Sequence, residues 1–368
     1  MKKYSLMGKG LAVGIILLFV GTCIIPSIAQ NIEKPLPTSR GNWLYVGGSG
    51  PGNYTRIQDA IDNASEGDTV FVFDDSSPYY ENLLINKSIY LIGENKETTI
   101  IDANDSGNSI TAQANDILIS GFTLQNSDSG ISIDKTYNTI ITDNIIVHNI
   151  YGILCSSSFN FSITKNTFKG NGDGIYLDDW QIGQISDNLI INNSDSGIYC
   201  YYANISVSIF NNKIINNGDY GIYVRGLSID IYNNSIENHG VGIYLEENYV
   251  KIHYNNIRNN TYGIYIDGGG SVSGYFNWIS NNNFIGNKIH VTFLYELLSK
   301  IVFIILLQPL QLNKFYHNYW DNHKLPCPKM IIGEMDWWGY PSGGFFTLKW
   351  FNFDWFPALK PNDIGGYR

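Results

Sequence analysis

Charged side chains are scarce in this sequence, and basic ones are scarcer than acidic ones. Charged residues make up 15% of the chain, against about 25% in a typical soluble domain. The 23 Lys and Arg are outnumbered by 33 Asp and Glu, which gives a formal net charge of −10. Because proteins bind nucleic acid through clusters of basic residues, this balance excludes nucleic acid as a partner. With 37 Gly and 26 Tyr, the composition favours an exported, β-rich protein over a cytosolic enzyme.

The N-terminus has the pattern of an export signal. Three lysines precede an apolar run from Leu11 to Ile25, and small residues at Ser27 and Ala29 follow it. We expect residues 1–29 to be a signal peptide cleaved after Ala29, and residues 30–42 to be a linker. The alternative is an uncleaved membrane anchor, in which case residues 10–29 would be the one contact with a membrane. Both predict a secreted or cell-surface location, or its periplasmic equivalent.

A repeat of about 22 residues dominates the middle of the chain. A Gly-Ile pair recurs with spacings of 22, 22, 23, 24, 21 and 21 residues, at Gly130, Gly152, Gly174, Gly197, Gly221, Gly242 and Gly263. An Asn-x-(Ile/Phe) element keeps step with it. This period predicts an all-β fold, in which each repeat is one coil of a β-solenoid and is stable only when it packs on its neighbours.

The repeat also predicts which side chains face inward. Ile or another aliphatic residue, or Cys, follows each Gly at one and three positions, so these two columns should line a continuous apolar core. The Asn pairs, such as Asn211-Asn212, should lie at sharp bends, because Asn tolerates left-handed backbone and its amide bonds neighbouring groups. Stacked Asn can also hydrogen-bond along the solenoid axis.

One column of the repeat carries the main functional prediction. The residue two after each Gly lies between two inward residues and should face out. In five consecutive coils it is tyrosine, at Tyr176, Tyr199, Tyr223, Tyr244 and Tyr265. We predict an exposed stripe about 19 Å long at ~4.8 Å per coil, whose rings bind a polysaccharide or glycan. The structural alternative is that stacked Tyr simply stabilise neighbouring strands.

A short helix is predicted upstream of the repeats. Thr55 and Gln58 have the spacing of a capping box, Ile57, Ala60, Ile61 and Ala64 form an apolar stripe, and Gly67 should end the helix. An uncovered solenoid end would invite edge-to-edge association. We therefore expect this helix to cap the N-terminal end.

These features resemble a known group of proteins. The segment "YYENLLINKSIYLIGENKETTIID" and the "NNxIxNNxxGIYL"-like coils are similar to right-handed parallel β-helix proteins of the pectin-lyase-like superfamily, and in particular to the NosD-type repeat. The resemblance implies a single right-handed parallel β-helix, which we place at residues 43–290. It leaves activity open, because the group includes pectic enzymes, a periplasmic protein implicated in copper delivery, and surface proteins.

The period fails downstream of the repeats. Residues 291–313 are apolar but interrupted by Glu296, Lys300, Gln308 and Pro309, and we expect a buried capping segment there rather than a membrane span. Residues 314–368 are rich in aromatic residues and Pro and should close the C-terminal end.

Catalytic and metal-binding candidates are few. In the column four after Gly, Arg225, Glu246 and Asp267 lie on successive coils, a spacing compatible with a polysaccharide lyase or hydrolase, or with a Ca²⁺ site. A solvated charged edge is the alternative. His317, His323 and Cys327 are close in sequence and could bind a soft metal such as the copper that the resemblance implies. We therefore predict no required cofactor, with Ca²⁺ and Cu as alternatives.

Two further patterns bear on chemistry. Cys155 and Cys200 share an inward column but are two coils apart, about 9.6 Å at ~4.8 Å per coil, which is too far for a disulfide. Asn-x-Ser/Thr sequons, the acceptor motif of N-glycosylation, occur at Asn53, Asn63, Asn86, Asn104, Asn160, Asn192, Asn204, Asn233 and Asn259.

Overall fold

The computed structural model describes residues 41–201, 206–246, 249–268, 276–298, 313–339 and 344–364. The predicted signal peptide or anchor at residues 1–29 and nearly all of the predicted linker lie outside the described residues. Across these ranges, no helix is long and apolar enough to span a membrane.

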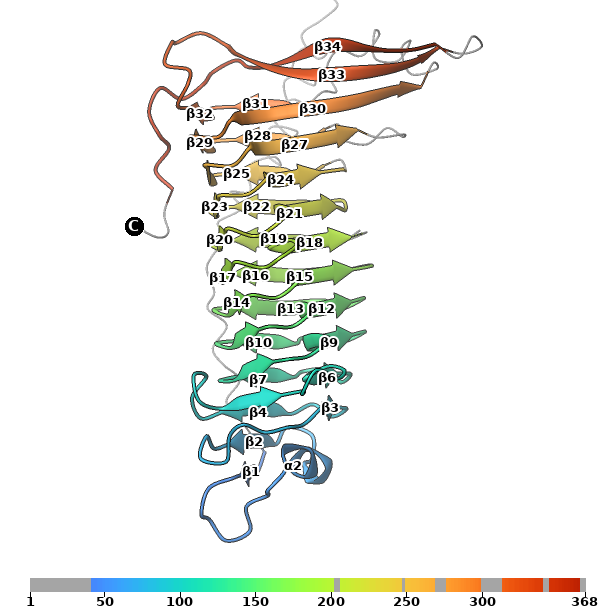
Figure 1. The fold of residues 1–368 in the computed structure, drawn as a ribbon, viewed down its shortest axis with the longest axis vertical. Coiled ribbons are helices and arrows are strands. Elements are labelled where there is room, and N and C mark those ends of the chain that lie inside the picture. The colour runs from blue at the N-terminus through green and yellow to red at the C-terminus, as the bar shows by residue number, and fades with distance from the viewer. Residues whose placement is uncertain are drawn as a thin grey trace, which may run out of the picture. The chain divides into compact units, whose positions relative to one another are not determined.

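The repeats form a parallel β-helix in which three stacks of strands run along one axis (Figure 1). We call these stacks the first, second and third sheets. The first sheet contains β1 (Trp43–Val46), β2 (Thr69–Val72), β4 (Tyr90–Gly93), β7 (Leu118–Ser120), β10 (Ile140–Thr142), β13 (Phe159–Thr164), β16 (Ile182–Ser186), β19 (Val207–Phe210), β22 (Ile229–Tyr232), β25 (Lys251–His253), β28 (Trp278–Ser280) and β31 (Lys314–Tyr316). The second contains β5 (Ile100–Asp102), β8 (Thr123–Gln125), β11 (Ile145–Val147), β14 (Thr167–Lys169), β17 (Leu189–Ile191), β20 (Lys213–Ile215), β23 (Ser235–Glu237), β26 (Asn256–Arg258), β29 (Asn283–Ile285) and β32 (Tyr319–Trp320). The third contains β3 (Leu83–Ile85), β6 (Ile110–Ala112), β9 (Ser129–Asp134), β12 (Tyr151–Ser156), β15 (Asp173–Asp178), β18 (Ile198–Tyr201), β21 (Tyr220–Arg225), β24 (Val241–Leu245), β27 (Tyr262–Gly268), β30 (Ile289–Leu298) and β33 (Lys329–Gly339).

The predicted register is confirmed. Ile153 pairs with Ile131 on one side and with Ile175 on the other, and Ile222 pairs with Ile198 and Ile243. The inward columns are fully buried and form one continuous apolar core through the described coils. Each coil therefore completes its core only with its neighbours, as expected for a solenoid.

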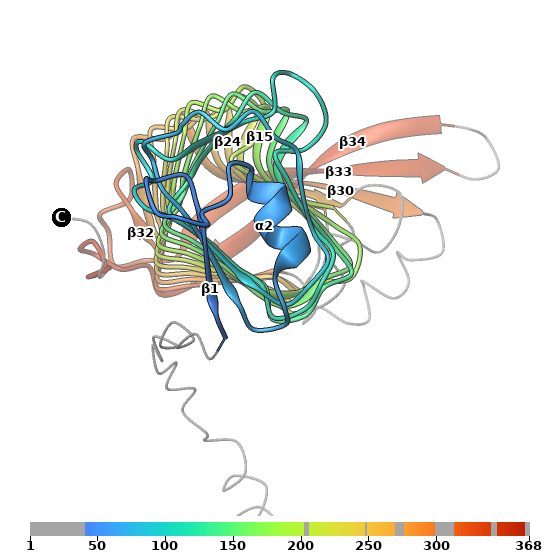
Figure 2. The same cartoon turned by 90° about the horizontal axis from the view of Figure 1, so that it is seen from below.

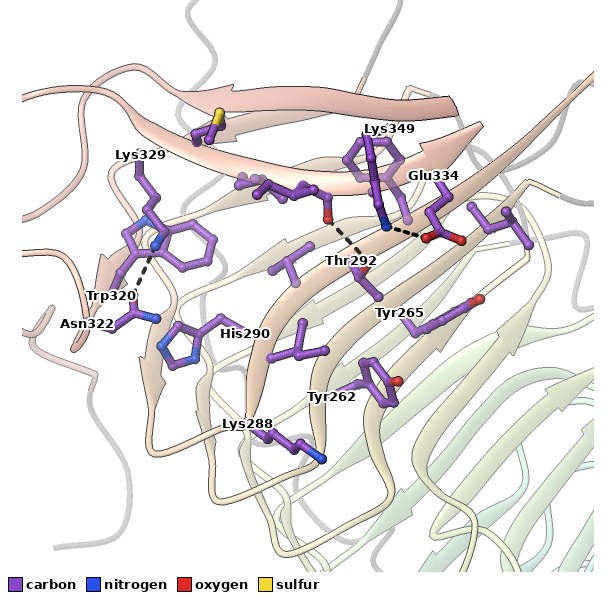
Figure 3. A pocket seen from close by; sticks show the side chains of 18 residues that line it. Tyr262, Tyr265, Lys288, His290, Thr292, Trp320, Asn322, Lys329, Glu334 and Lys349 are labelled. Atoms are coloured by element: carbon purple, nitrogen blue, oxygen red, sulfur yellow. Dashed lines mark hydrogen bonds and ion pairs between the residues drawn. The ribbon is translucent and has the colours of Figure 1, made fainter. Parts of the chain in front are cut away.

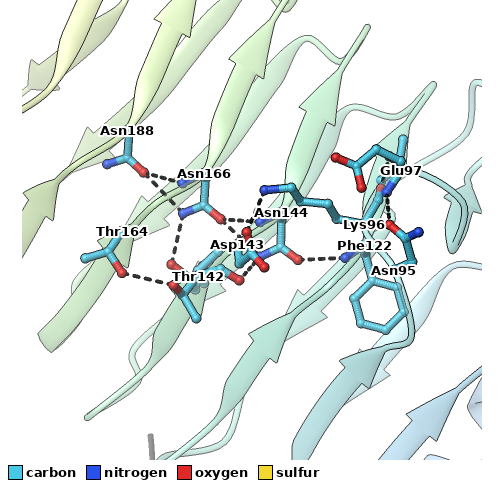
Figure 4. A network of polar contacts seen from close by, with 12 residues as sticks. Asn95, Lys96, Glu97, Phe122, Thr142, Asp143, Asn144, Thr164, Asn166 and Asn188 are labelled. Carbon is cyan, nitrogen blue, oxygen red and sulfur yellow. Dashed lines mark hydrogen bonds and ion pairs between the residues drawn. The ribbon is translucent and has the colours of Figure 1, made fainter. Parts of the chain in front are cut away.

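Two buried ladders of side chains run along the corners of the coils. The first ladder contains Asn144, Asn166, Asn188, Asn212, Asn234, Asn255, Asn282 and Asn318, and the second contains Asn149, Asn171, Asn193, Asn217, His239, Asn260 and Asn287. Figure 4 shows the start of the first ladder, where Asn166 Oδ1 accepts hydrogen bonds from the backbone N–H and the side-chain amide of Asn144, at 3.0 and 3.1 Å. Since each amide pairs with the next coil, the buried corners have no unpaired polar groups at these positions.

The two residues of each Asn pair have different structural roles. The first residue of a pair turns the chain in the left-handed region, with φ of 55° at Asn211 and 52° at Asn216. The second residue, Asn212 or Asn217, is buried and joins a ladder. The pairs recur because every coil must turn and must also satisfy its inner corner.

The N-terminal helix α2 (Ile57–Asn63) is present and buries Ile57, Ala60 and Ile61. Seen along the axis, it lies within the outline of the coils, as a cap should (Figure 2). The predicted capping box is wrong, because the N-cap residue is Arg56 and makes no side-chain cap bond. Instead the Glu81 carboxylate, from the following coil, accepts the N–H groups of Ile57 and Gln58 at 2.8 and 3.1 Å.

Parallel stacking continues beyond residue 290, where we expected the β-helix to end. β30 pairs with β27, β31 with β28, and β32 with β29. The last coils are longer than the rest, which is why their period is hidden in the sequence. β33 then stacks on β30 and forms an antiparallel hairpin with β34 (Gly344–Asp354). Residues 299–312 of the predicted capping segment lie outside the described residues.

Candidate functional site

The Tyr stripe, defined as Tyr176, Tyr199, Tyr223, Tyr244 and Tyr265, forms a continuous stack on the outer face of the third sheet. Successive residues are register partners on neighbouring coils. Their ring centroids are 5.1, 4.2, 5.3 and 5.3 Å apart, and neighbouring planes differ by 11° or less. The five tyrosines therefore stack in register on successive coils, as the spacing of the repeat predicted.

The exposure of the stripe differs from the prediction. Tyr223 is only 6% exposed, and the other four rings are partly buried. Because the rings stack face to face, Tyr199, Tyr223 and Tyr244 cover one another's faces. The three inner rings therefore cannot each offer a face to a sugar.

The predicted catalytic candidates support the hydroxyl ends of the stripe. Asp267 Oδ2 accepts a hydrogen bond from Tyr244 Oη at 2.6 Å, and Arg225 Nε lies 3.4 Å from Glu246 Oε2. The pKa of Tyr244 is raised, mainly by burial and next by the hydrogen bond to Asp267. The pKa of Tyr223 is raised in the same way, mainly by burial and next by a hydrogen bond to Glu246. The structure thus gathers these charged residues into a rim beside the stripe.

A groove of about 540 Å³ opens at the C-terminal end of the stripe (Figure 3). It lies between β27, β30 and β33. Tyr262 and Tyr265 line one side of it, with their rings 5.7 Å apart and perpendicular. The next residue in the stripe's column is Thr292, whose small side chain leaves room beside Tyr265. The groove is within the 300–1,000 Å³ typical of ligand sites.

The lining of this groove is basic. Lys288, Lys329 and Lys349 line it together with one acidic residue, Glu334. Lys349 pairs with Glu334, whereas Lys329 Nζ donates to Asn322 Oδ1 at 3.0 Å. Burial lowers the pKa of Lys329. On a chain with net charge −10, this cluster gives the groove a local excess of positive charge.

His290 lies buried at the inner side of the groove (Figure 3). Its Nε2 lies 2.8 Å from Asp321 Oδ1, although this contact lacks the alignment of a hydrogen bond. Burial lowers the pKa of the imidazole despite the nearby carboxylate. A neutral His290 leaves the three lysines as the cations of the groove.

The predicted metal ligands do not come together as a set. His323 Nε2 contacts the carbonyl oxygen of Cys327 at 2.9 Å and its sulfur at 3.9 Å, while His317 stacks on Tyr316. Over the described ranges, no group of three or more His, Cys, Asp or Glu side chains is arranged to hold a metal ion. In the described part of the chain, His317, His323 and Cys327 therefore do not form a three-ligand copper site.

Sequence reasoning missed the groove. Its lysines come from three separate segments, and the hairpin that supplies Lys329 and Lys349 follows residues where the repeat can no longer be read. The available signal was a change in charge: residues 288–368 contain eight Lys and Arg and six Asp and Glu, the reverse of the balance in the chain as a whole.

The stacked coils, buried ladders and capping helix define a parallel β-helix protein. The family model described as "Periplasmic copper-binding protein (NosD)" matches residues 61–225 and 185–295. The chain belongs to this family, as the resemblance in its coils indicated.

Solved structures show the same fold at low sequence identity. The A-module of the mannuronan C-5 epimerase AlgE6 from Azotobacter vinelandii is 17% identical with a TM-score of 0.55, over 75% of this chain and 82% of that chain. A pectate lyase is 15% identical with a TM-score of 0.55, over 69% of this chain and 78% of its own. At these identities the likeness shows the fold alone.

A curated relative is closer in sequence over a short stretch. A cell surface glycoprotein of Methanothermus fervidus is 36% identical over 94 residues, which is 25% of this chain and 16% of the relative. The chain therefore spans about a sixth of the length of that relative.

Proposed function

We propose that this protein is exported to the cell surface and binds a glycan that carries carboxylate groups, along the groove and the adjoining edge of the Tyr stripe. The observation that carries the proposal is the convergence of Lys288, Lys329 and Lys349 on a groove that Tyr262 and Tyr265 line on one side. Lysines attract carboxylates, and tyrosines combine an apolar surface with a hydroxyl for hydrogen bonds, which suits a sugar.

The geometry changes how the Tyr stripe would take part. Its inner rings cover one another and Tyr223 is almost buried, so sugar would meet a broader surface only at the Tyr262 and Tyr265 end. The stacked rings of the stripe would then form a rigid surface that continues into the groove. Binding to such a surface would cost little side-chain conformational entropy, because its rings are already fixed.

Export and surface display have two supports. One is the signal-peptide pattern of residues 1–29. The other is the relative named as a cell surface glycoprotein. The carboxylate-bearing glycan as ligand is supported by the lysines and tyrosines of the groove.

The enzyme alternative has weaker support in this geometry. Asp267 accepts a hydrogen bond from Tyr244, and Glu246 pairs with Arg225. Carboxylates held in this way stabilise the stripe, whereas a general acid and base must reach the scissile bond. Binding without cleavage is therefore the function proposed.

Retention on immobilised polysaccharides tests the proposal. The purified protein should be retained on uronate-containing polymers such as pectate and alginate, pass through neutral glucans, and release no reducing ends or unsaturated products. Retention by none of the polymers would refute glycan binding. Product release that is lost in Glu246→Gln and Asp267→Asn variants would establish the enzyme instead.

A further inference from the structure

The structure separates the N-glycosylation sequons into two groups. At Asn53, Asn63 and Asn160 the side-chain amide is a hydrogen-bond donor, to Gly47 O at 2.6 Å, Asp59 O at 2.8 Å and Asn138 Oδ1 at 2.5 Å. An attached sugar would replace one amide hydrogen and crowd these contacts. We therefore expect these three sequons to stay unmodified in the folded protein.

Four other sequons present an available amide. Asn86, Asn104, Asn192 and Asn259 are all exposed, and within the described residues none of their side-chain amides makes a hydrogen bond. Asn233 is partly buried, and Asn204 lies outside the described residues. An exposed Asn with an unengaged Nδ2 is accessible to a transferase in the folded protein.

Asn192 and Asn259 meet these conditions because of the Asn pairs. Each is the first residue of a pair and turns the chain in the left-handed region, with φ of 55° and 56°. The second residues, Asn193 and Asn260, are buried in the second ladder. Since the ladder residue points inward, the sequon Asn at the bend points away from the core. The third residues, Ser194 and Thr261, are exposed.

We infer that Asn86, Asn104, Asn192 and Asn259 are N-glycosylation sites, an inference that rests on the proposed export of the chain. The sugar donor would be an oligosaccharide linked to a lipid phosphate, and a transferase would catalyse the step. The Asn Nδ2 forms a bond to the anomeric carbon, the bond from that carbon to the phosphate oxygen breaks, and the lipid phosphate leaves with the electron pair. The amide gives one proton to a base of the transferase.

Two of these sites lie beside the face that carries the Tyr stripe. The second ladder follows the corner between the second sheet and the third sheet, and the third sheet carries the Tyr stripe. Asn192 and Asn259 are three coils apart on this corner, about 14 Å at ~4.8 Å per coil. A sugar on Asn259 would stand next to the groove, because Asn259 is three residues before Tyr262, whereas a sugar on Asn192 would stand farther along the stripe.

Glycopeptide mass spectrometry on the full chain, produced in a host that N-glycosylates exported proteins, tests the inference. We expect glycan mass on peptides containing Asn86, Asn104, Asn192 and Asn259. Ser194→Ala and Thr261→Ala should each remove the glycan from Asn192 or Asn259 alone. These substitutions leave the ladder residues unchanged and so should preserve folding, which circular dichroism can check.

The outcomes separate this inference from the proposed function. Exported protein with no glycan at the four sites, or with glycan at Asn53, would overturn the inference and leave export standing. Protein that stays inside the cell would contradict the proposed export. In that case the folded protein is treated with a transferase and a lipid-linked donor, and the same four sites must then be modified.

Discussion

The carboxylate of Asp354 takes the place of an Asn at the end of the first ladder. Its Oδ2 accepts hydrogen bonds from the backbone N–H and the side-chain amide of Asn318, at 3.0 and 3.2 Å, and from the Trp320 indole at 3.1 Å. Asp354 is fully buried and is the last residue of β34. The ladder that runs through the coils thus ends on the hairpin that completes the groove.

Replacing Asp354 with Ala should strongly destabilise the protein. The change leaves three buried donors without an acceptor, each worth about 1–3 kcal/mol, so we expect a loss of at least about 3 kcal/mol in the free energy of unfolding. Urea denaturation followed by circular dichroism measures it. Asp363→Ala, which removes an exposed carboxylate from the same tail, is the control, and an equal midpoint for both variants would contradict the role of Asp354.

Within the Tyr stripe, the loss of stability on removing a ring should depend on the position of that ring in the stack. Tyr223 is 6% exposed and stacks on Tyr199 and Tyr244, whereas Tyr176 is partly buried and has one partner in the stripe. Tyr223→Ser should therefore destabilise by about 2 kcal/mol or more, and Tyr176→Ser by less. Thermal unfolding of the two variants gives the comparison, and a larger loss for Tyr176→Ser would contradict the stacked geometry.

The inward columns and the corners could be predicted from sequence because each is a local property repeated in every coil. One Ile placed on the inner face fixes its partners, such as Ile222 between Ile198 and Ile243. The partial burial of Tyr223 could not be predicted, because it depends on ring stacking between coils. The helix cap was missed for a related reason: Glu81 is 24 residues from Ile57 in sequence.

The groove could not be predicted from the sequence repeat. Between β30 and β33 the chain departs from its period, and the pairing of Leu294 with Glu334 spans 40 residues. No local pattern places Lys329 beside Tyr262. The basic lining therefore becomes visible only when the hairpin is placed in space.

A buried carboxylate should make stability depend on pH. Burial, together with the charges of Asp195 and Asp219, raises the pKa of Asp173 to about 6. Because this pKa lies above that of the unfolded chain, about 3.9, the folded state binds the extra proton, and stability falls as pH rises from about 4 to 6. Asp173→Asn should raise the melting temperature at pH 7 and not at pH 4. No difference between the two pH values would contradict this assignment.

The two core thiols should be inert in the folded protein. Cys155 and Cys200 are buried two coils apart with Leu177 between them, and burial raises the pKa of each thiol to about 12. A maleimide at pH 8 should label the exposed Cys327 and spare both core residues until guanidinium unfolds the chain. Mass spectrometry of the labelled peptides reads the result. Rapid labelling of Cys155 in folded protein would contradict the inward column.

The most direct measurement of the proposed function is the affinity of the groove for an acidic oligosaccharide. Isothermal titration with an oligogalacturonate should give a dissociation constant that Lys288→Ala/Lys329→Ala raises about tenfold or more, since 1.4 kcal/mol is a factor of ten, and the binding should weaken with salt. Lys251→Ala, which removes an exposed lysine from the first sheet, should bind like the wild type. An unchanged affinity in the folded groove variant would contradict the account.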